Sequence, residues 1–303
     1  MRKLDPSELY DLDPDRPELS GVVLVQALEG FIDAGGARKL ASQHLLDTLE
    51  HRVLVRFDHD QLYDYRARRP VMVFAKDHWE SYDAPELAIH LVQDADGHDF
   101  LLLAGPEPDV QWERFVAAVL QLCRTLGVRR SIGLNAIPMA LPHTRPVGVI
   151  AHGVPRSLVE GYEPWIETVH VPGSAGHLLE HRLGEAGLEA MGFAVHVPHY
   201  VSQSAYPAAA AQLVREVASN SGLRLPVEAL DEAAVSTRTV LDEQVAGAPE
   251  VAEVVRQLEQ QYDAFVSGRD LLAPGMSEAE LPTADELGAE LERFLAEQQR
   301  PEQ

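Results

Sequence analysis

Hydrophobic and polar residues change spacing repeatedly along the first 222 positions of the chain. Short β-branched apolar runs, such as residues 21–27 (GVVLVQA), are typical of strands buried on both faces of a sheet. Longer segments carry apolar residues three and four positions apart, which is the spacing of an amphipathic helix. This alternation predicts an α/β fold, a layered sandwich with a largely parallel sheet.

The individual elements follow from these runs and from the turn residues between them. We expect strands at 21–27, 52–57, 71–75, 88–92, 100–104, 130–135, 147–151 and 192–200, and helices at 34–49, 109–126, 174–191 and 206–221. The turn at 94–97 (DADG) predicts a hairpin between its two flanking strands. Asp109 and Ser174 are expected to cap helices, and Gly127 to end one.

Strand patterns stop near residue 222, and the chain becomes strongly acidic. Residues 227–303 contain 18 acidic and 5 basic residues. We therefore divide the chain into a sandwich domain (1–225) and an acidic helical C-terminal extension (226–303), with helices at 251–265 and 284–296 joined by a loop at 273–276. The extension is either a solvated appendage packed on the sandwich or an arm for oligomerisation or partner binding.

Composition narrows the function classes. The 303 residues carry a formal net charge of −23, which argues against nucleic acid or an anionic membrane as a partner. The sequence has no apolar run long enough for a membrane span and no signal peptide at its start, so we expect a cytoplasmic protein. The single cysteine, Cys123, excludes an internal disulfide and fits a core position.

A glycine-rich turn joins the first strand to the first helix and contains Gly30, Asp33, Gly35 and Gly36. Glycines let the backbone approach a ligand, and helix N-terminal amides favour anions. The turn matches neither GxGxxG nor a P-loop, and the Asp33 carboxylate would itself satisfy the amides. Both a ligand-binding turn and a helix cap with tight packing remain open.

Two further loops leave predicted strand ends, where ligand sites gather in α/β sheets. Glu107 lies between two prolines and is a candidate general base, metal ligand or solvent-facing charge. The proline-rich segment 135–146 displays Asn135, His143, Thr144 and Arg145, which offer a proton switch, a hydroxyl and a planar cation. This loop is either part of a site or a rigid structural loop at a subunit contact.

The segment around His199 and Tyr200 is a weaker candidate. In a regular strand His196 and Tyr200 would share one face and His199 would take the other, so the two histidines could not ligate one metal. The chain contains no HExxH, CxxC or GxSxG motif. We therefore expect no metal site, and the sequence leaves the cofactor and any catalytic residue undefined.

Four segments in this order resemble the bacterial, actinobacterial-type branch of the proteasome assembly chaperone 2 family. They are GFIDAG (30–35), GPEP (105–108) with Trp112, PMALPHTRP (138–146) and VPHY (197–200). The resemblance spans about residues 20–225, and the acidic helical tail also fits that branch. It implies a three-layer α/β/α sandwich of the phosphorylase/hydrolase-like type and a homo-oligomer, for which we expect a trimer.

Two functional hypotheses follow. The first is a non-catalytic, assembly-chaperone-like homo-oligomer that binds a proteasome-like or other ring complex, as relatives in the family do. The alternative is a small-molecule-binding protein or enzyme, for example an ATP-dependent carboxylate–amine ligase or a phosphorylase/hydrolase-like enzyme. In that case Asp33, Asn135 and Arg145 would line one concave pocket at the strand ends.

Overall fold

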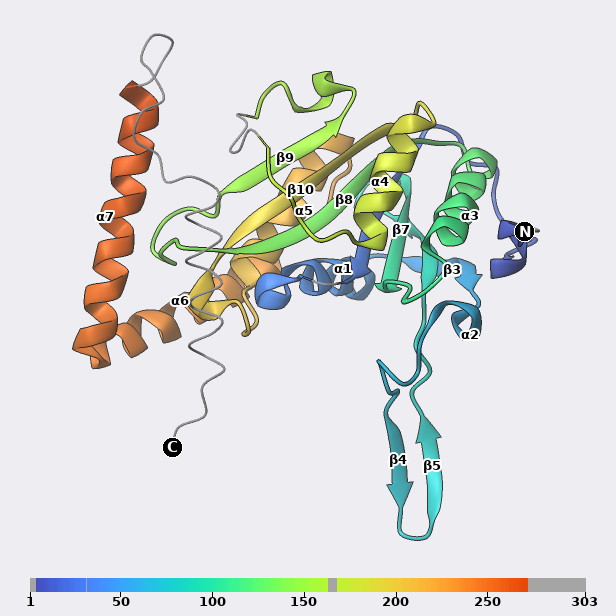
Figure 1. Cartoon of the computed structure of the whole chain (residues 1–303), viewed down its shortest axis with the longest axis horizontal. Helices are drawn as coiled ribbons and strands as arrows, with labels where there is room; N and C mark the ends of the chain where they lie inside the picture. Colours follow the sequence, from blue (N-terminus) through green and yellow to red (C-terminus); the bar gives the residue numbers. More distant parts are fainter. Residues whose placement is uncertain (1–3, 31, 163–167, 272–303) are drawn as a thin grey trace.

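The computed structural model describes residues 4–30, 32–162 and 168–271, and its centre is an eight-stranded sheet (Figure 1). In order across the sheet the strands are β1 (Tyr10–Leu12), β3 (His51–Phe57), β6 (Ala88–Gln93), β7 (Asp99–Pro106), β2 (Val22–Glu29), β8 (Val128–Met139), β10 (Glu189–Pro198) and β9 (Val149–Val154). Short 3-10 turns are η1 (Pro6–Leu9), η2 (Ala34–Gly36), η3 (Arg156–Val159) and η4 (His199–Val201).

The middle of the sheet is parallel and its edges are antiparallel. Strands β7, β2, β8 and β10 run in the same direction, whereas β6 and β9 flank them in the opposite direction. The β6–β7 pair is the hairpin expected around the turn at 94–97. Because parallel strands carry their carboxyl ends to one edge, the loops after β2, β7, β8 and β10 meet at the same end of the sheet.

Helices cover both faces of the sheet, which confirms the three-layer sandwich. Helices α1 (Ala37–Thr48) and α5 (Pro207–Ser221) share one hydrophobic cluster with the sheet. Helices α3 (Trp112–Thr125) and α4 (Ala175–Glu185) pack in a second cluster on the other face. A single turn of helix, α2 (His59–Leu62), follows β3. Cys123 is buried in the second cluster, as its spacing predicts.

Two helix boundaries differ from expectation for local reasons. Asp109 does not cap α3, whose N-cap is Gln111. The Asp109 carboxylate instead accepts the Asp64 N–H at 2.9 Å and pairs with Arg68 at 2.7 Å. Helix α4 ends at Glu185 because Gly187 adopts a left-handed φ of 82°. The Ser174 cap and the end of α3 at Gly127, with φ 63°, are confirmed.

A separate hairpin of β4 (Met72–Ala75) and β5 (His78–Tyr82) projects far from the sandwich (Figure 1). The strand expected at 71–75 therefore exists, but it pairs only with β5 rather than joining the main sheet. Its partner was not predicted, since the segment 78–82 mixes charged, aromatic and polar residues.

The C-terminal part of the described chain is an arm of two long helices, α6 (Glu228–Gly247) and α7 (Pro249–Leu271). Leu230 of α6 joins the cluster beneath α5, and α7 stands away from the sandwich at the side opposite the hairpin (Figure 1). The helix expected at 251–265 lies within α7. The loop expected at 273–276 and the helix expected at 284–296 fall outside the described residues. No helix in the described ranges is both long and apolar enough to cross a bilayer.

Candidate functional site

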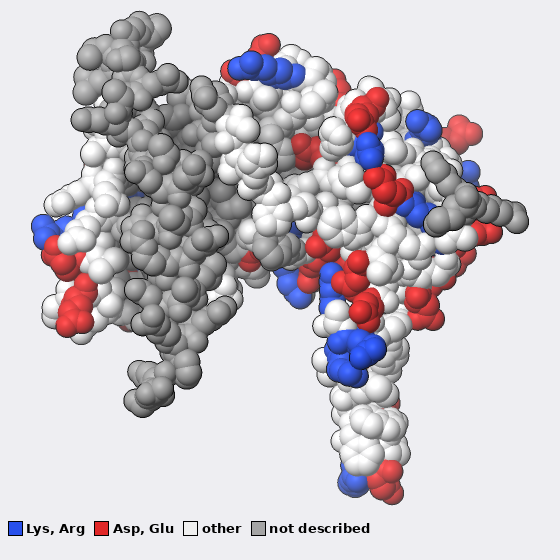
Figure 2. Space-filling model, in the orientation of Figure 1, with Lys and Arg blue, Asp and Glu red and all other residues white. Residues whose placement is uncertain are grey.

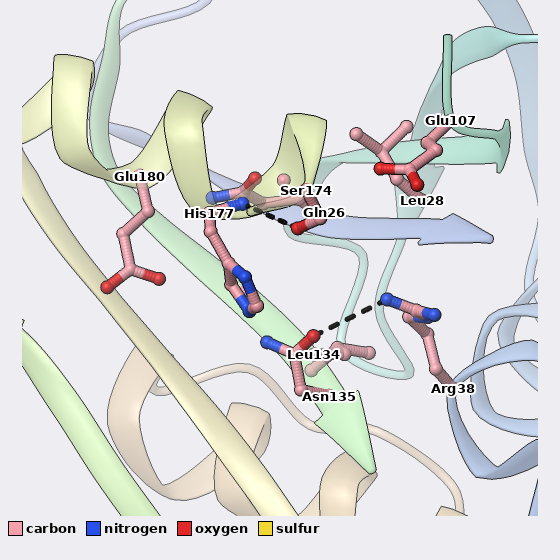
Figure 3. Close-up of a pocket in the computed structure, with 11 residues that line it drawn as sticks. Gln26, Leu28, Arg38, Glu107, Leu134, Asn135, Ser174, His177 and Glu180 are labelled. Atoms are coloured by element: carbon pink, nitrogen blue, oxygen red, sulfur yellow. Dashed lines mark hydrogen bonds between the residues drawn. The ribbon is translucent and has the colours of Figure 1, made fainter. Parts of the chain in front are cut away.

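A small polar cavity of about 20 Å³ lies between the carboxyl ends of β2 and β7, the middle of β8 and the N-terminal half of α4 (Figure 3). It is lined by Gln26, Leu28, Arg38, Glu107, Gly133, Leu134, Asn135, Ser174, Gly176, His177 and Glu180. The sheet contributes amide side chains, α1 a guanidinium, and α4 an imidazole and a carboxylate. Two of the expected site residues, Glu107 and Asn135, are therefore brought together here.

Arg38 is the cation of this cavity, and sequence reasoning missed it. It projects from the first turn of α1 and is only 5% exposed. Its Nη2 donates to the Ile32 carbonyl at 2.9 Å, its Nη1 reaches Asn135 Oδ1 at 3.4 Å, and its Nε has no hydrogen-bond partner among the described residues. Burial lowers the pKa of Arg38, and the carboxylates of Asp33, Glu107 and Glu29 oppose that shift. The sequence signal that could have indicated a buried Arg38 is its position directly after small residues in the run GGARKLA.

Glu107 is a buried acceptor rather than a solvent-facing charge. Its Oε2 accepts the Ala175 N–H at 2.8 Å, so it satisfies the first amide of α4 from across the cavity. A Cβ at Gly30 would lie 2.8 Å from the Glu107 Cδ, so Gly30 is the residue that lets this carboxyl group approach the turn. Glu107 therefore fastens α4 to the sheet edge and presents a negative charge to the cavity.

The Asp33 carboxylate satisfies free amides at the start of α1, whose N-cap residue is Gly36. Its two carboxylate oxygens accept the amides of Arg38 at 2.8 Å and Lys39 at 3.1 Å. Gly35 and Gly36 take left-handed φ values of 66° and 56°, which separate the 3-10 turn η2 from α1 and break the continuous helix expected from residue 34. Asp33 does not line the cavity.

His143, Thr144 and Arg145 lie away from the cavity and hold the C-terminal arm. Arg145 forms a bidentate pair with Asp263 of α7 at 2.8 and 2.6 Å and also reaches Glu259 at 3.2 Å, while Thr144 donates to Glu259. These bonds raise the pKa of Arg145. The expected pocket of Asp33, Asn135 and Arg145 is therefore not formed: only Asn135 lines the cavity.

His143 is almost fully buried between the sandwich and α6. The Tyr200 hydroxyl accepts the His143 backbone N–H at 2.7 Å and lies 2.6 Å from Nδ1, so its single proton points to Nδ1. The Nε2–H of His143 is then left to donate to Asp242 at 3.1 Å. Burial raises the pKa of Tyr200 to about 12. This series of hydrogen bonds links η4, the loop after β8 and α6.

The segment around His199 and Tyr200 is not the regular strand for which alternating faces were expected. Strand β10 ends at Pro198, and His199 and Tyr200 form the 3-10 turn η4 instead of continuing the strand. His196 is buried, which lowers its pKa to about 4. No group of His, Cys, Asp or Glu with metal-site geometry occurs in the described part of the chain.

Beside the cavity, a carboxylate and an imidazole from distant segments form a pair that sequence spacing did not reveal. His152 Nδ1 of β9 lies 2.6 Å from Glu180 Oε1 of α4. Gly133 of β8 and Gly192 of β10 are paired across the two strands and leave room for these side chains. A Cβ at Gly192 would lie 2.8 Å from Glu180 Oε2. Burial, followed by repulsion from His152, lowers the pKa of His177.

The family model for the PAC2 family matches residues 27–245. The Mycobacterium tuberculosis unknown function protein Rv2714 is 48% identical, with a TM-score of 0.83 over 88% of this chain and 95% of that one. A Corynebacterium glutamicum protein of unknown function is 42% identical, with a TM-score of 0.82 over 85% and 98%. No curated protein matches the sequence.

A third structure carries a functional description. The M. tuberculosis proteasome-assembly chaperone homologue Rv2125 is 28% identical to this chain, with a TM-score of 0.72 over 77% of this chain and 100% of that one. The family model covers well over half of the sequence, and the matched region contains the end of β2, the later strands of the sheet and every cavity-lining residue except Gln26. The chain belongs to the PAC2 family.

Proposed function

We propose that this protein is a non-catalytic, assembly-chaperone-like interaction protein that forms a homo-oligomer and binds a proteasome-like or other ring complex in the cytoplasm. The observation that carries the proposal is the β4–β5 hairpin, which presents apolar side chains to solvent well outside the sandwich (Figures 1 and 2). The similarity to a structure described as a proteasome-assembly chaperone homologue supports it independently.

The hairpin has the composition of a contact surface. Phe74 and Trp79 are 56% and 62% exposed, and their rings stack edge to face with centroids 5.1 Å apart. Met72 pairs with Tyr82 in the register of the two strands, so these residues add to the same exposed apolar face. A two-stranded hairpin is marginally stable alone in water, and exposed apolar patches mark interaction sites. We infer that another chain covers this face.

The charges of the hairpin favour a second copy of the same chain. Arg66 and Arg69 lie in the segment that leads into β4, whereas Glu80 lies in β5 and Asp83 directly follows it; Lys76 and Asp77 share the turn at the tip. If the β4 edge of one copy lies along the β5 edge of the next, opposite charges meet and open backbone groups pair. A head-to-tail contact of this kind generates a ring when the rotation between copies closes, and we expect a trimer.

The oligomeric state tests this part of the proposal. Light scattering coupled to size-exclusion chromatography should give a trimer for the wild type and a monomer for the double variant Phe74→Ser/Trp79→Ser. Val235→Ser is the matched control, because Val235 of α6 is equally exposed, at 68%, but lies on the arm. A monomeric wild type, or a double variant that still forms the wild-type oligomer, would contradict the proposal.

Binding to the ring complex is a separate test. The full chain should co-elute with purified proteasome α subunits of its own organism, and an unrelated acidic protein of similar size should not. No co-elution with either free subunits or assembled rings would count against a proteasome partner, whatever the oligomeric state.

The second candidate, a small-molecule-binding protein or enzyme, rests on the buried guanidinium in the cavity. A volume of about 20 Å³ holds a water molecule or one small functional group, whereas drug-sized ligand pockets are usually about 300–1,000 Å³. The geometry therefore supports recognition of one group more readily than enclosure of a nucleotide, and we place this candidate second.

A further inference from the structure

The cavity brings a buried cation and a buried anion into one small space without joining them directly. Arg38 is 5% exposed and Glu107 is 7% exposed, and both line the cavity. Within the described residues Arg38 forms no ion pair, and its Nε has no hydrogen-bond partner. Figure 3 shows the guanidinium pointing toward Asn135, with the carboxyl group of Glu107 across the cavity. A buried donor left without a partner is costly, so a group that bridges the two would be stabilising.

The surrounding charges restrict what that group can be. Asp33, Glu107 and Glu29 all lie close enough to stabilise the charge of Arg38, and Glu180 lines the far side of the cavity. An anion would meet these carboxylates, and a cation would meet the guanidinium. A neutral group that accepts a hydrogen bond on one side and donates one on the other has neither penalty.

The amide side chains of Gln26 and Asn135 do not themselves act as this neutral bridging group. Gln26 uses its Nε2 to donate to Ser131 Oγ at 3.0 Å, and Asn135 offers its Oδ1 to Arg38 only at the long distance of 3.4 Å. Neither side chain therefore satisfies the guanidinium fully. The cavity has room for one small functional group and is partly open to solvent.

We propose that this cavity binds the terminal carboxamide of a small molecule. The carbonyl oxygen accepts from the Arg38 guanidinium, and the NH₂ group donates to the Glu107 carboxylate. This inference goes beyond the assembly-chaperone proposal and does not depend on it, since it concerns the sheet edge rather than the hairpin.

Three probes of the same shape test the proposal: acetamide, acetate and acetamidinium. They differ only in charge and in which atoms donate. The readout is the Nε–H resonance of Arg38 in full-length protein labelled with ¹⁵N-arginine and assigned with Arg38→Lys. We expect a saturable shift with acetamide and dissociation constants about tenfold weaker, or more, for the two charged probes. Equal or tighter binding of acetate or acetamidinium, or no saturable shift with any probe, overturns the proposal.

Glu107→Gln supplies the variant arm of the same experiment. Glutamine keeps the shape and can still accept the Ala175 N–H, but it removes the negative charge. We expect acetate to bind this variant about tenfold more tightly than it binds the wild type. Glu86→Gln is the control, because it removes a carboxylate that pairs with Arg56 on the surface, and it should leave all three probes unchanged. If Glu107→Gln does not fold, the wild-type probe series still decides.

Discussion

At the scale of single residues, the glycine-rich turn shows which features sequence reasoning can reach. The cap made by Asp33 was predictable, because a carboxylate just before an amphipathic segment has an obvious use. The burial of Arg38 was not, because it depends on Asn135 and Glu107, which lie 97 and 69 positions further along the chain and meet Arg38 only in the folded protein. Sequence reasoning therefore identified the cavity residues Asn135 and Glu107, which accept hydrogen bonds, and missed Arg38, which donates them.

Gly35 and Gly36 allow a paired prediction. Both have left-handed φ values, but a Cβ at Gly35 would lie 2.7 Å from the Tyr206 Cβ, whereas a Cβ at Gly36 would meet nothing within 4 Å. Gly36→Ala should lower the free energy of unfolding by about 1–2 kcal/mol from backbone strain alone. Gly35→Ala should cost roughly 1–3 kcal/mol more, because overpacking adds to the strain. Urea unfolding of both variants measures the difference, and equal losses would contradict the packing account.

His196 makes stability depend on pH. Its pKa is about 4 in the folded protein and near 6.5 when unfolded, so between these values the unfolded chain binds the additional proton. Above pH 6.5 the neutral His196 costs no stability. As the pH falls below 6.5 the free energy of unfolding decreases, and the loss due to His196 reaches about 3 kcal/mol at pH 4. The decrease in the free energy of unfolding from pH 7 to pH 4 should be smaller by this amount in His196→Gln. An identical decrease in both proteins would show that His196 is not buried and neutral.

At the scale of elements, local sequence patterns predicted the strands and helices of the sandwich better than the β4–β5 hairpin and the C-terminal helices. The strands and helices of both layers follow from apolar spacing, because each buries one or two faces against a neighbour. Helix α6 was not predicted, since Leu230 is its one buried residue and its apolar pattern is weak. The 135–146 segment was equally ambiguous, because its polar side chains suggested a single site. The fold places Asn135 within β8 and shows that His143 and Arg145 contact α6 and α7.

Arg145 should control how firmly α7 is held. Arg145→Met removes the bidentate pair with Asp263, which also keeps the pKa of that carboxyl group low, and we expect faster cleavage of α7 in limited proteolysis. Arg256→Met is the matched control, because the ion pair that Arg256 forms among the described residues, with Glu253, lies within α7 itself. Similar cleavage rates for the two variants would mean that the arm does not depend on the Arg145 contact.

At the scale of the whole molecule, the chain has an apolar hairpin at one side and an acidic helical arm at the other (Figures 1 and 2). The net charge of −23 keeps such a molecule soluble and disfavours indiscriminate contact between copies. Specific association therefore has to come from surfaces such as the hairpin, where apolar area and segregated charge coincide. The division between a sandwich at 1–225 and an extension at 226–303 stays a prediction.

The central claim is that this protein promotes assembly of a ring complex without catalysing a reaction. The most direct measurement is the rate at which purified proteasome subunits of its organism form complete rings, with and without the full-length protein. We expect the protein to accelerate ring formation, and Phe74→Ser/Trp79→Ser to abolish the acceleration while Val235→Ser preserves it. Unchanged rates with the correctly folded wild type would contradict the account.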